Sequence, residues 1–253
     1  MHNPYSTKTD RKSFEQLERI PTPAPEGIYR PIAHSYLLDL VREKIDKRGM
    51  KILEEDHVTS RGNQRYFGIL SVQSDSDDST KMIGIRNSHD KSVSAAVCGG
   101  ERVTVCSNML FYGDVMIARK HTTNIFAELG DRVDSALDEL MESWMFHESR
   151  MDEFKKFTNL TPNKSDHLIM EAYRRKAIKK TEIADVSESF RNPEHEEFKN
   201  YTAWSFLQAF TEVWKGSTTS LHELPTKSQK VISMIEDHVR FENTSLRAYN
   251  AEF

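Results

Sequence analysis

The residues best suited to chemistry lie between Asn87 and His121. His89 and Asp90 follow one β-prone run, Cys106 ends a later run, and His121 lies beyond a third. Histidine, cysteine and aspartate are common ligands of zinc and other transition metals, and a thiolate can attack a substrate when a histidine acts as its base. These four side chains are therefore the candidate catalytic residues of a metal- or thiol-dependent hydrolase.

The spacing and surroundings of these residues favour a structural role. No Cys-x-x-Cys or His-Glu-x-x-His pair accompanies them, so we predict no metal centre and no cofactor. Asn87 and Asp90 are of types that bond their own backbone in turns, and Asn108 is of a type that caps a loop. Cys106 follows a valine and is typical of a small, inert core residue. With no Gly-x-x-x-x-Gly-Lys phosphate loop either, the balance favours a protein that is not an enzyme.

Basic residues are concentrated between Lys81 and His121. This range holds six Lys and Arg residues against three acids, within a chain of net charge -4. A local basic excess on a sheet could contact phosphates, while exposed aromatic rings could stack on bases. The alternative is a solvated sheet face with ordinary counter-charges. The residues that we expect to bind nucleic acid, if their side chains share one face, are Arg86, Lys91, Arg102, Tyr112, Arg119 and Lys120.

An acidic helical segment suggests a different kind of partner. The range 127–156 contains nine acids against four bases, and its apolar residues recur at helical spacing. An acidic face of this kind usually points to solvent. Its alternative use is contact with a basic partner or mimicry of nucleic acid, for example in a protein that inhibits a host defence system.

Length and composition bound the class of protein. A chain of 253 residues with 37% hydrophobic and 29% charged residues can bury one substantial core, and it contains no apolar run long enough to span a membrane. The first ten residues are polar and lack the apolar stretch of a secretory signal. Two cysteines are too few for a disulfide scaffold. We therefore expect a cytoplasmic protein of a bacterial host cell, without a membrane partner.

The first half of the chain predicts a sheet. Residues 1–31 are rich in proline and charge, so we expect an extended or partly disordered arm before a single α+β domain at 32–253. A first helix should begin near Ile32 and end at Gly49, where glycine suits a C-cap. Gly99-Gly100 should form a hairpin turn. The sheet region is 51–118, an antiparallel meander of strands at 51–58, 65–72, 81–86, 92–98, 102–106 and 115–118.

The second half predicts helices that pack on this sheet. Apolar residues spaced three or four apart indicate a long helix from Ile125 to about Phe157, which Gly130 could interrupt. A second helix should run over 166–178 with Ser165 as its cap, and 191–197 should be a loop. Two further helices are expected at 201–215 and 228–241, which makes 125–243 the helical region of an α+β fold.

Three ordered segments resemble a known family. They are 84–92, 103–110 and 118–122, with a further echo at 202–212, and they are similar to the phage and plasmid family catalogued as domain of unknown function nine-three-two, some of whose members are called phage/plasmid-like proteins. The resemblance implies provenance on a mobile element and a shared fold, without a catalytic mechanism, and it does not extend to 216–253. The family motif residues are Asn87, Ser88, His89, Asp90, Cys106, Asn108, Arg119, Lys120, His121, Trp204, Thr211 and Glu212.

Three functions follow from these patterns. The first is a phage- or plasmid-encoded accessory protein that binds single- or double-stranded DNA during replication, recombination or transfer of a mobile element. The second is a non-enzymatic interaction protein that inhibits a host defence system through a host protein, with self-association into a homo-oligomer as a related use. The third is the hydrolase described above.

Overall fold

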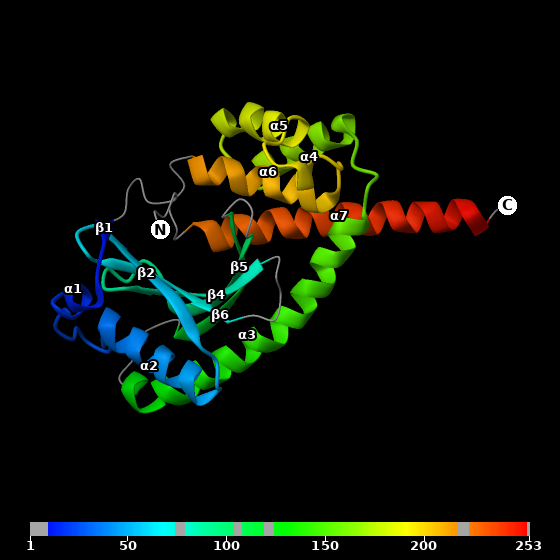
Figure 1. Ribbon diagram of the computed structural model, residues 1–253. Coiled ribbons are helices and arrows are strands. Elements are labelled where there is room, and N and C mark those ends of the chain that lie inside the picture. The colour runs from blue at the N-terminus through cyan, green and yellow to red at the C-terminus, as the bar shows by residue number, and fades with distance from the viewer. Residues whose placement is uncertain (1–9, 74–78, 104–107, 119–123, 217–222, 252–253) are drawn as a thin grey trace. The chain divides into compact units, whose positions relative to one another are not determined.

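The computed structural model describes residues 10–73, 79–103, 108–118, 124–216 and 223–251 (Figure 1). The chain divides into two compact units. Unit 1 comprises residues 1–145 and 220–225, and unit 2 comprises residues 146–219 and 226–253. Unit 1 contains the sheet, and unit 2 is built from helices.

The sheet of unit 1 is a six-stranded antiparallel meander. Its strands lie side by side in chain order, and each described pairing is antiparallel. This confirms the predicted α+β class, with the sheet in the first half of the chain and helices mainly in the second. The strands are β1 (Asp10–Arg11), β2 (Ile52–Ser60), β3 (Arg65–Val72), β4 (Ser79–Ser88), β5 (Ala95–Val103) and β6 (Met109–Ala118).

Gly99 and Gly100 do not form the predicted turn. They lie inside β5, where Gly99 pairs with Ile83 on one side and Tyr112 on the other. A Cβ atom on Gly99 would lie 2.8 Å from Leu140 Cδ1 and 3.0 Å from the Tyr112 ring. The glycine is therefore needed for close packing of a ring and a helix on the sheet, because a glycine inside a strand often marks such an approach.

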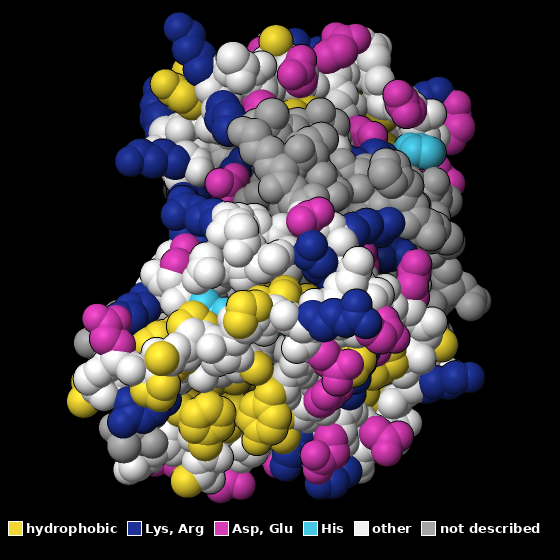
Figure 2. Space-filling model, turned by 90° about the vertical axis from the view of Figure 1, so that its left-hand side faces the viewer, with side chains coloured by type: hydrophobic (Ala, Val, Ile, Leu, Met, Phe, Trp, Pro, Cys, Tyr) yellow, Lys and Arg dark blue, Asp and Glu magenta, His cyan; other side chains and the backbone are white. Residues whose placement is uncertain are grey.

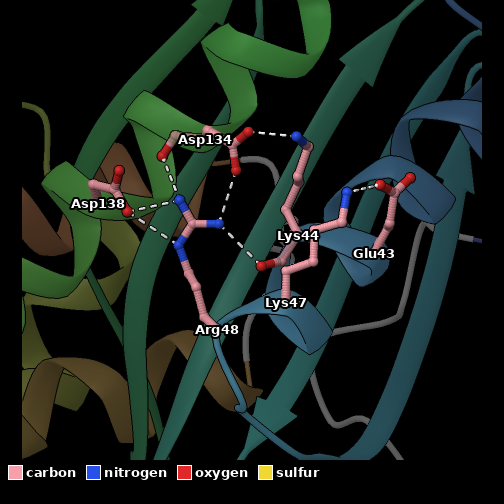
Figure 3. Close-up of polar contacts among 6 residues, drawn as sticks. All are labelled: Glu43, Lys44, Lys47, Arg48, Asp134 and Asp138. Carbon is pink, nitrogen blue, oxygen red and sulfur yellow. Dashed lines mark hydrogen bonds and ion pairs between the residues drawn. The ribbon is translucent and has the colours of Figure 1, made fainter.

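Helix α2 (His34–Lys47) and the part of α3 (Ile125–Lys156) up to residue 145 supply the helical layer of unit 1. Figure 1 shows α2 and the first part of α3 on the same side of the sheet. Arg48 donates to Asp134 Oδ1 at 2.8 Å and to Asp138 Oδ1 at 2.6 Å, and Lys44 also contacts Asp134 (Figure 3). This network joins the end of α2 to α3, and the helix at 125–156 and the glycine at the end of α2 match the sequence prediction.

The segment before α2 contains two elements that the sequence did not predict. Residues 10–11 form β1, and α1 (Phe14–Glu18) follows directly. Ser13 caps α1 through a reciprocal pair of hydrogen bonds with Gln16, the arrangement known as a capping box. Leu17 is buried, and the Arg42 guanidinium lies 4.4 Å from the Phe14 ring centroid. These contacts attach the segment to unit 1.

Unit 2 contains α4 (Pro162–Arg174), α5 (Ile183–Arg191), α6 (Ala203–Gly216), most of α7 (Leu224–Ala251) and two short 3-10 turns, η1 (Lys180–Glu182) and η2 (Glu196–Phe198). The prediction of Ser165 as the cap of α4 is wrong, because Ser165 lies inside the helix and its Oγ donates to Pro162 O at 2.6 Å. Helix α5 was not predicted. Among the helices described in both units, none has the length and apolar composition needed to cross a membrane.

Candidate functional site

One end of the sheet gathers segments that are distant in sequence. Arg65 pairs with both Ser60 and Ser88, so β2 ends, β3 begins and β4 ends at the same end of the sheet. Ala95 pairs with Ala118, which places the start of β5 and the end of β6 there as well. We call this end of the sheet the Ser88 end.

A buried polar cluster of His34, Asn87 and His89 underlies the Ser88 end. The two histidine rings are stacked, with centroids 3.9 Å apart and planes inclined by 6°. The Asn87 amide donates to Ile32 O at 2.8 Å and to His34 Nδ1 at 3.1 Å. Because His34 Nδ1 accepts, its Nε2 carries the hydrogen and donates to Asn63 O at 3.0 Å. The cluster thus fastens the start of α2 to β4 and to the turn after β2.

The buried position of His89 favours its neutral form. Its Nε2 donates to Ile32 O at 3.0 Å, and burial lowers its pKa despite this hydrogen bond and the nearby Asp90. His89 Nδ1 and Asn87 Oδ1 are buried acceptors with no hydrogen-bond donor among the described residues. The side chain is 5% exposed, so in this conformation a substrate does not reach the ring. Its hydrogen bonds hold neighbouring segments of the chain in position.

Sequence reasoning missed a second buried chain of polar groups beside this cluster. Tyr66 Oη lies 3.2 Å from His57 Nδ1, and His57 Nε2 lies 3.1 Å from Glu55 Oε2. Burial raises the pKa of Glu55, but hydrogen bonds from His57 and Arg42 outweigh it and bring the pKa to about 2. Alternation of Glu55, His57 and Thr59 along β2 is the signal that could have predicted an inward-facing polar row.

The surface of the Ser88 end carries cationic side chains. Asp90 contacts Arg65 Nε at 3.2 Å and Arg61 Nη1 at 3.9 Å, and it also accepts from the Ser92 backbone at 3.0 Å. The Arg61 side chain is 65% exposed. Lys91 is 50% exposed, pairs with Glu26, and lies over the Tyr29 ring. Arg61 and Lys91 both adopt left-handed backbone conformations, with φ of 52° and 59°.

Asn108 does not share this end with Asn87 and His89. It immediately precedes Met109, which pairs with Arg102, and Arg102 pairs with Thr80 at the start of β4. At about 3.3 Å per residue, Thr80 and Asn87 are separated by roughly 20 Å along the strand. The prediction that these polar segments meet at one rim is wrong for Asn108, because consecutive connections of a meander alternate between the two ends of the sheet.

The described members of the predicted basic surface do not form one patch, and on the face of the molecule drawn in Figure 2 Lys and Arg side chains are mixed with Asp and Glu side chains. Arg102 lies at the far end, where it donates to Glu54 at 2.9 Å, and Arg86 is partly buried beside the Ser88 end. Tyr112 is 4% exposed beneath Gly99, so its ring is not open to a base. Lys91 is the exposed member that the structure does place at the Ser88 end. The predicted residues that lie outside the described part of the chain are Cys106, Arg119, Lys120 and His121.

The family segment at 202–212 lies at the start of α6 in unit 2. Thr211 is buried, and its hydroxyl donates to Gln208 O at 2.8 Å. Trp204 packs against Phe198 with ring centroids 4.9 Å apart, and Glu212 pairs with Lys215 on the helix surface. These contacts are structural. No group of three His, Cys, Asp or Glu side chains that could hold a metal ion occurs among the residues whose positions are described.

Comparison with known proteins assigns the chain to a family. The chain matches the family model described as Domain of unknown function (DUF932) over residues 25–238, and it belongs to this family. The matched range includes both buried polar groups of unit 1 and the helices of unit 2 up to His238, so the expectation that the resemblance ends before residue 216 is wrong. Searches of the curated proteins and of the solved structures returned no significant match to the chain.

Proposed function

We propose that this chain is a phage- or plasmid-encoded accessory protein that binds nucleic acid during replication, recombination or transfer of a mobile element. The binding surface is the Ser88 end of the sheet. One observation carries the proposal: two exposed cations, Arg61 and Lys91, lie on neighbouring loops there, and both occupy backbone conformations that favour glycine. The provenance follows from the family resemblance in the sequence.

The backbone conformations of Arg61 and Lys91 support a role for their side chains. In the left-handed region a Cβ atom crowds the neighbouring backbone, so side chains other than asparagine and aspartate are uncommon there. Folding alone would be served better by glycine at both positions. Local strain of this kind is often kept where a side chain has a function, and here both side chains are cationic.

The surroundings of these two residues fit a phosphate backbone. Arg65, at the start of β3, and Arg30, in the segment whose Glu26 and Tyr29 contact Lys91, add two further cations against Asp90 and Glu26. The ion pairs of Arg61 and Lys91 are solvent-exposed, so their net free energies are small and phosphate oxygens can replace the carboxylates.

The buried cluster gives this surface a fixed geometry. His89 N donates to Gln64 O at 2.7 Å, which joins the loop after β4 to the turn after β2. His34 and Asn87 attach the same two segments to the start of α2. Binding groups on loops are effective when a rigid scaffold positions them. The family motif around His89 therefore serves the surface by holding its loops, without touching the ligand.

The test uses glycine substitutions that suit the backbone. In the double variant Arg61→Gly, Lys91→Gly we expect weaker binding of fluorescently labelled single- and double-stranded DNA. The slope of log K against log salt should become less steep by roughly 1.5, because each lost phosphate contact removes about 0.7 to 0.9. Asn63→Gly, also at a left-handed position in the same turn, is the matched control and should bind like the wild type. An unchanged affinity and slope in the double variant would exclude the Ser88 end as the interface.

The other two functions stay predictions. Within the described residues, Asp90 is turned to Arg65 and Ser92, and His89 bonds Ile32 O, so neither is poised as a catalytic group. The remaining hydrolase candidates, Cys106 and His121, lie outside the described part of the chain. No feature of the described residues favours inhibition of a host defence system over nucleic-acid binding.

A further inference from the structure

The end of α4 in unit 2 carries a dense group of basic residues. Residues 171–182 contain five basic residues against two acids, Glu171 and Glu182. Ala177 and Ile178 are buried, while the lysines on either side of them are exposed. The group, called the α4 end below, consists of Arg174, Arg175, Lys176, Lys179 and Lys180.

Lys176 occupies a position that helix geometry assigns to glycine. Ala177 N donates to Ala172 O and Lys176 N donates to Tyr173 O, both at 2.9 Å, which is the hydrogen-bond pattern of a Schellman motif. Lys176 is the left-handed residue of that motif, with φ of 58°. Glycine is the usual residue there because it has no Cβ atom. The lysine side chain is thus present at a conformational cost to folding.

Lys179 and Lys180 also lie where folding does not favour cations. Lys180 is the first residue of η1, which leads directly into α5, and Lys179 is the residue before it. The first turn of a helix presents unpaired N–H groups and a partial positive charge, so acidic side chains are preferred there. The helix dipole explains Arg174 at the end of α4 but not these two lysines.

Counter-charges neutralise only part of the α4 end. Arg175 bonds both Glu171 at 2.9 Å and Asp237 at 3.2 Å, while Glu182 is buried and accepts from Lys179 N at 2.7 Å. Lys176 and Lys180 form no ion pair within the described part of the chain. A further cation is directed to the same turn, because Lys230 Nζ lies 3.5 Å from Lys176 O. The surface therefore has uncompensated positive charge.

We infer that the α4 end is a second nucleic-acid-binding surface, which holds a single-stranded segment. Lys176 and Lys180 contact the phosphates, and Tyr173, which is 39% exposed one turn before Lys176, stacks on a base. Cations beside an exposed aromatic ring are the combination that binds single strands, because unpaired bases offer their faces for stacking. The inference takes its ligand class from the proposed function and adds a separate surface, in unit 2, with a preference for single strands.

The experiment compares two double variants by fluorescence anisotropy with labelled oligothymidylate over a salt series. Lys176→Gly, Lys180→Ala should weaken binding several-fold at low salt and reduce the log–log salt slope by roughly 1.4. Lys47→Ala, Lys199→Ala removes the same number of exposed lysines elsewhere and should leave both quantities unchanged. Because glycine suits the backbone at 176, the thermal midpoint should not fall, which separates lost binding from lost folding.

A stacking variant and the variant of the Ser88 end complete the test. Tyr173→Ser should weaken the binding of oligothymidylate several-fold and leave the binding of duplex DNA unchanged. If Lys176→Gly, Lys180→Ala binds normally while Arg61→Gly, Lys91→Gly does not, the inference fails and the proposed function stands. If only the α4 end variant loses binding, the inference holds and the Ser88 end is not the interface. Equal losses on single-stranded and duplex probes for Tyr173→Ser would overturn the single-strand preference.

Discussion

Helices α2 and α4 end with the same hydrogen bonds but with different residues. At the end of α2, Gly49 N donates to Asp46 O and Met50 N donates to Ile45 O, and Gly49 has φ of 70°. At the end of α4 the corresponding left-handed residue is Lys176. The α2 end follows the preference of the backbone. The α4 end departs from it, and the departure adds a cation to an exposed surface. A side chain that local geometry does not favour is therefore informative about function.

The start of α2 differs from both of these helix ends, because buried polar groups hold it in place. Replacing Asn87 with Leu would remove the amide that donates to Ile32 O and to His34 Nδ1, both of which belong to buried residues. We expect the free energy of unfolding to fall by about 3 kcal/mol, the largest effect among these predictions. Urea unfolding of the full chain measures it. A loss below about 1 kcal/mol would mean that the cluster does not hold α2 in place.

The end of α2 should tolerate a lysine poorly. No atom lies within 4 Å of a Cβ built on Gly49, so the cost of Gly49→Lys is conformational. We expect a loss of about 1 kcal/mol in the free energy of unfolding, measured by urea unfolding. Gly49→Asn is the matched control, because asparagine accepts left-handed conformations and should lose less. Equal losses in the two variants would remove backbone strain as the explanation.

The reverse substitution at the α4 end should have the opposite sign. Lys176→Gly relieves left-handed strain, although glycine also loses more entropy on folding, so we expect a gain of about 0.5 kcal/mol. The same unfolding measurement on this variant, paired with Lys176→Ala, checks the prediction. Alanine keeps the Cβ atom and should give no gain. A loss of stability in Lys176→Gly would show that the lysine side chain contributes to folding.

The smallest expected effect concerns pH. Burial lowers the pKa of His89 in the folded protein, so the unfolded chain binds more protons as the pH falls through the ordinary histidine pKa of about 6.5. The contribution of His89 is therefore full above that pH and is lost progressively below it. We expect His89→Gln to reduce the fall in unfolding free energy between about pH 7 and pH 5. His238, whose pKa is also lowered by burial, contributes separately. A fall in the unfolding free energy of the His89→Gln variant equal to that of the wild type would contradict the prediction.

Local pattern located only some of the long elements of this fold, because α7 (Leu224–Ala251) extends beyond the predicted 228–241 at both ends. The spacing of apolar residues located α3 at 125–156, and Gly49 located the end of α2. The same rules failed at Gly99-Gly100, because two glycines between β-prone runs resemble a turn and only the packing of Leu140 and Tyr112 shows their purpose. Helix α5 was missed because its surroundings, with Pro193 close by, are typical of a loop.

The candidate site could be predicted only in part. Sequence resemblance selected Asn87 and His89, but their partner His34 lies 53 residues before Asn87, and such long-range pairs are not encoded in any local pattern. The charge pattern predicts a basic surface on the sheet face, whereas the exposed cations Arg61 and Lys91 lie on the loops at the Ser88 end. The left-handed conformations of Arg61 and Lys176 also require coordinates, because neither residue type suggests them.

Binding of nucleic acid through exposed cations is the central claim, and the salt dependence of DNA binding by the wild-type chain tests it most directly. The account predicts binding at low salt whose log K falls linearly with log salt, with a slope steeper than about -1.4, the value expected for two phosphate contacts on a single strand. Absence of binding to both single- and double-stranded DNA at low salt, or binding that does not change with salt, would contradict it.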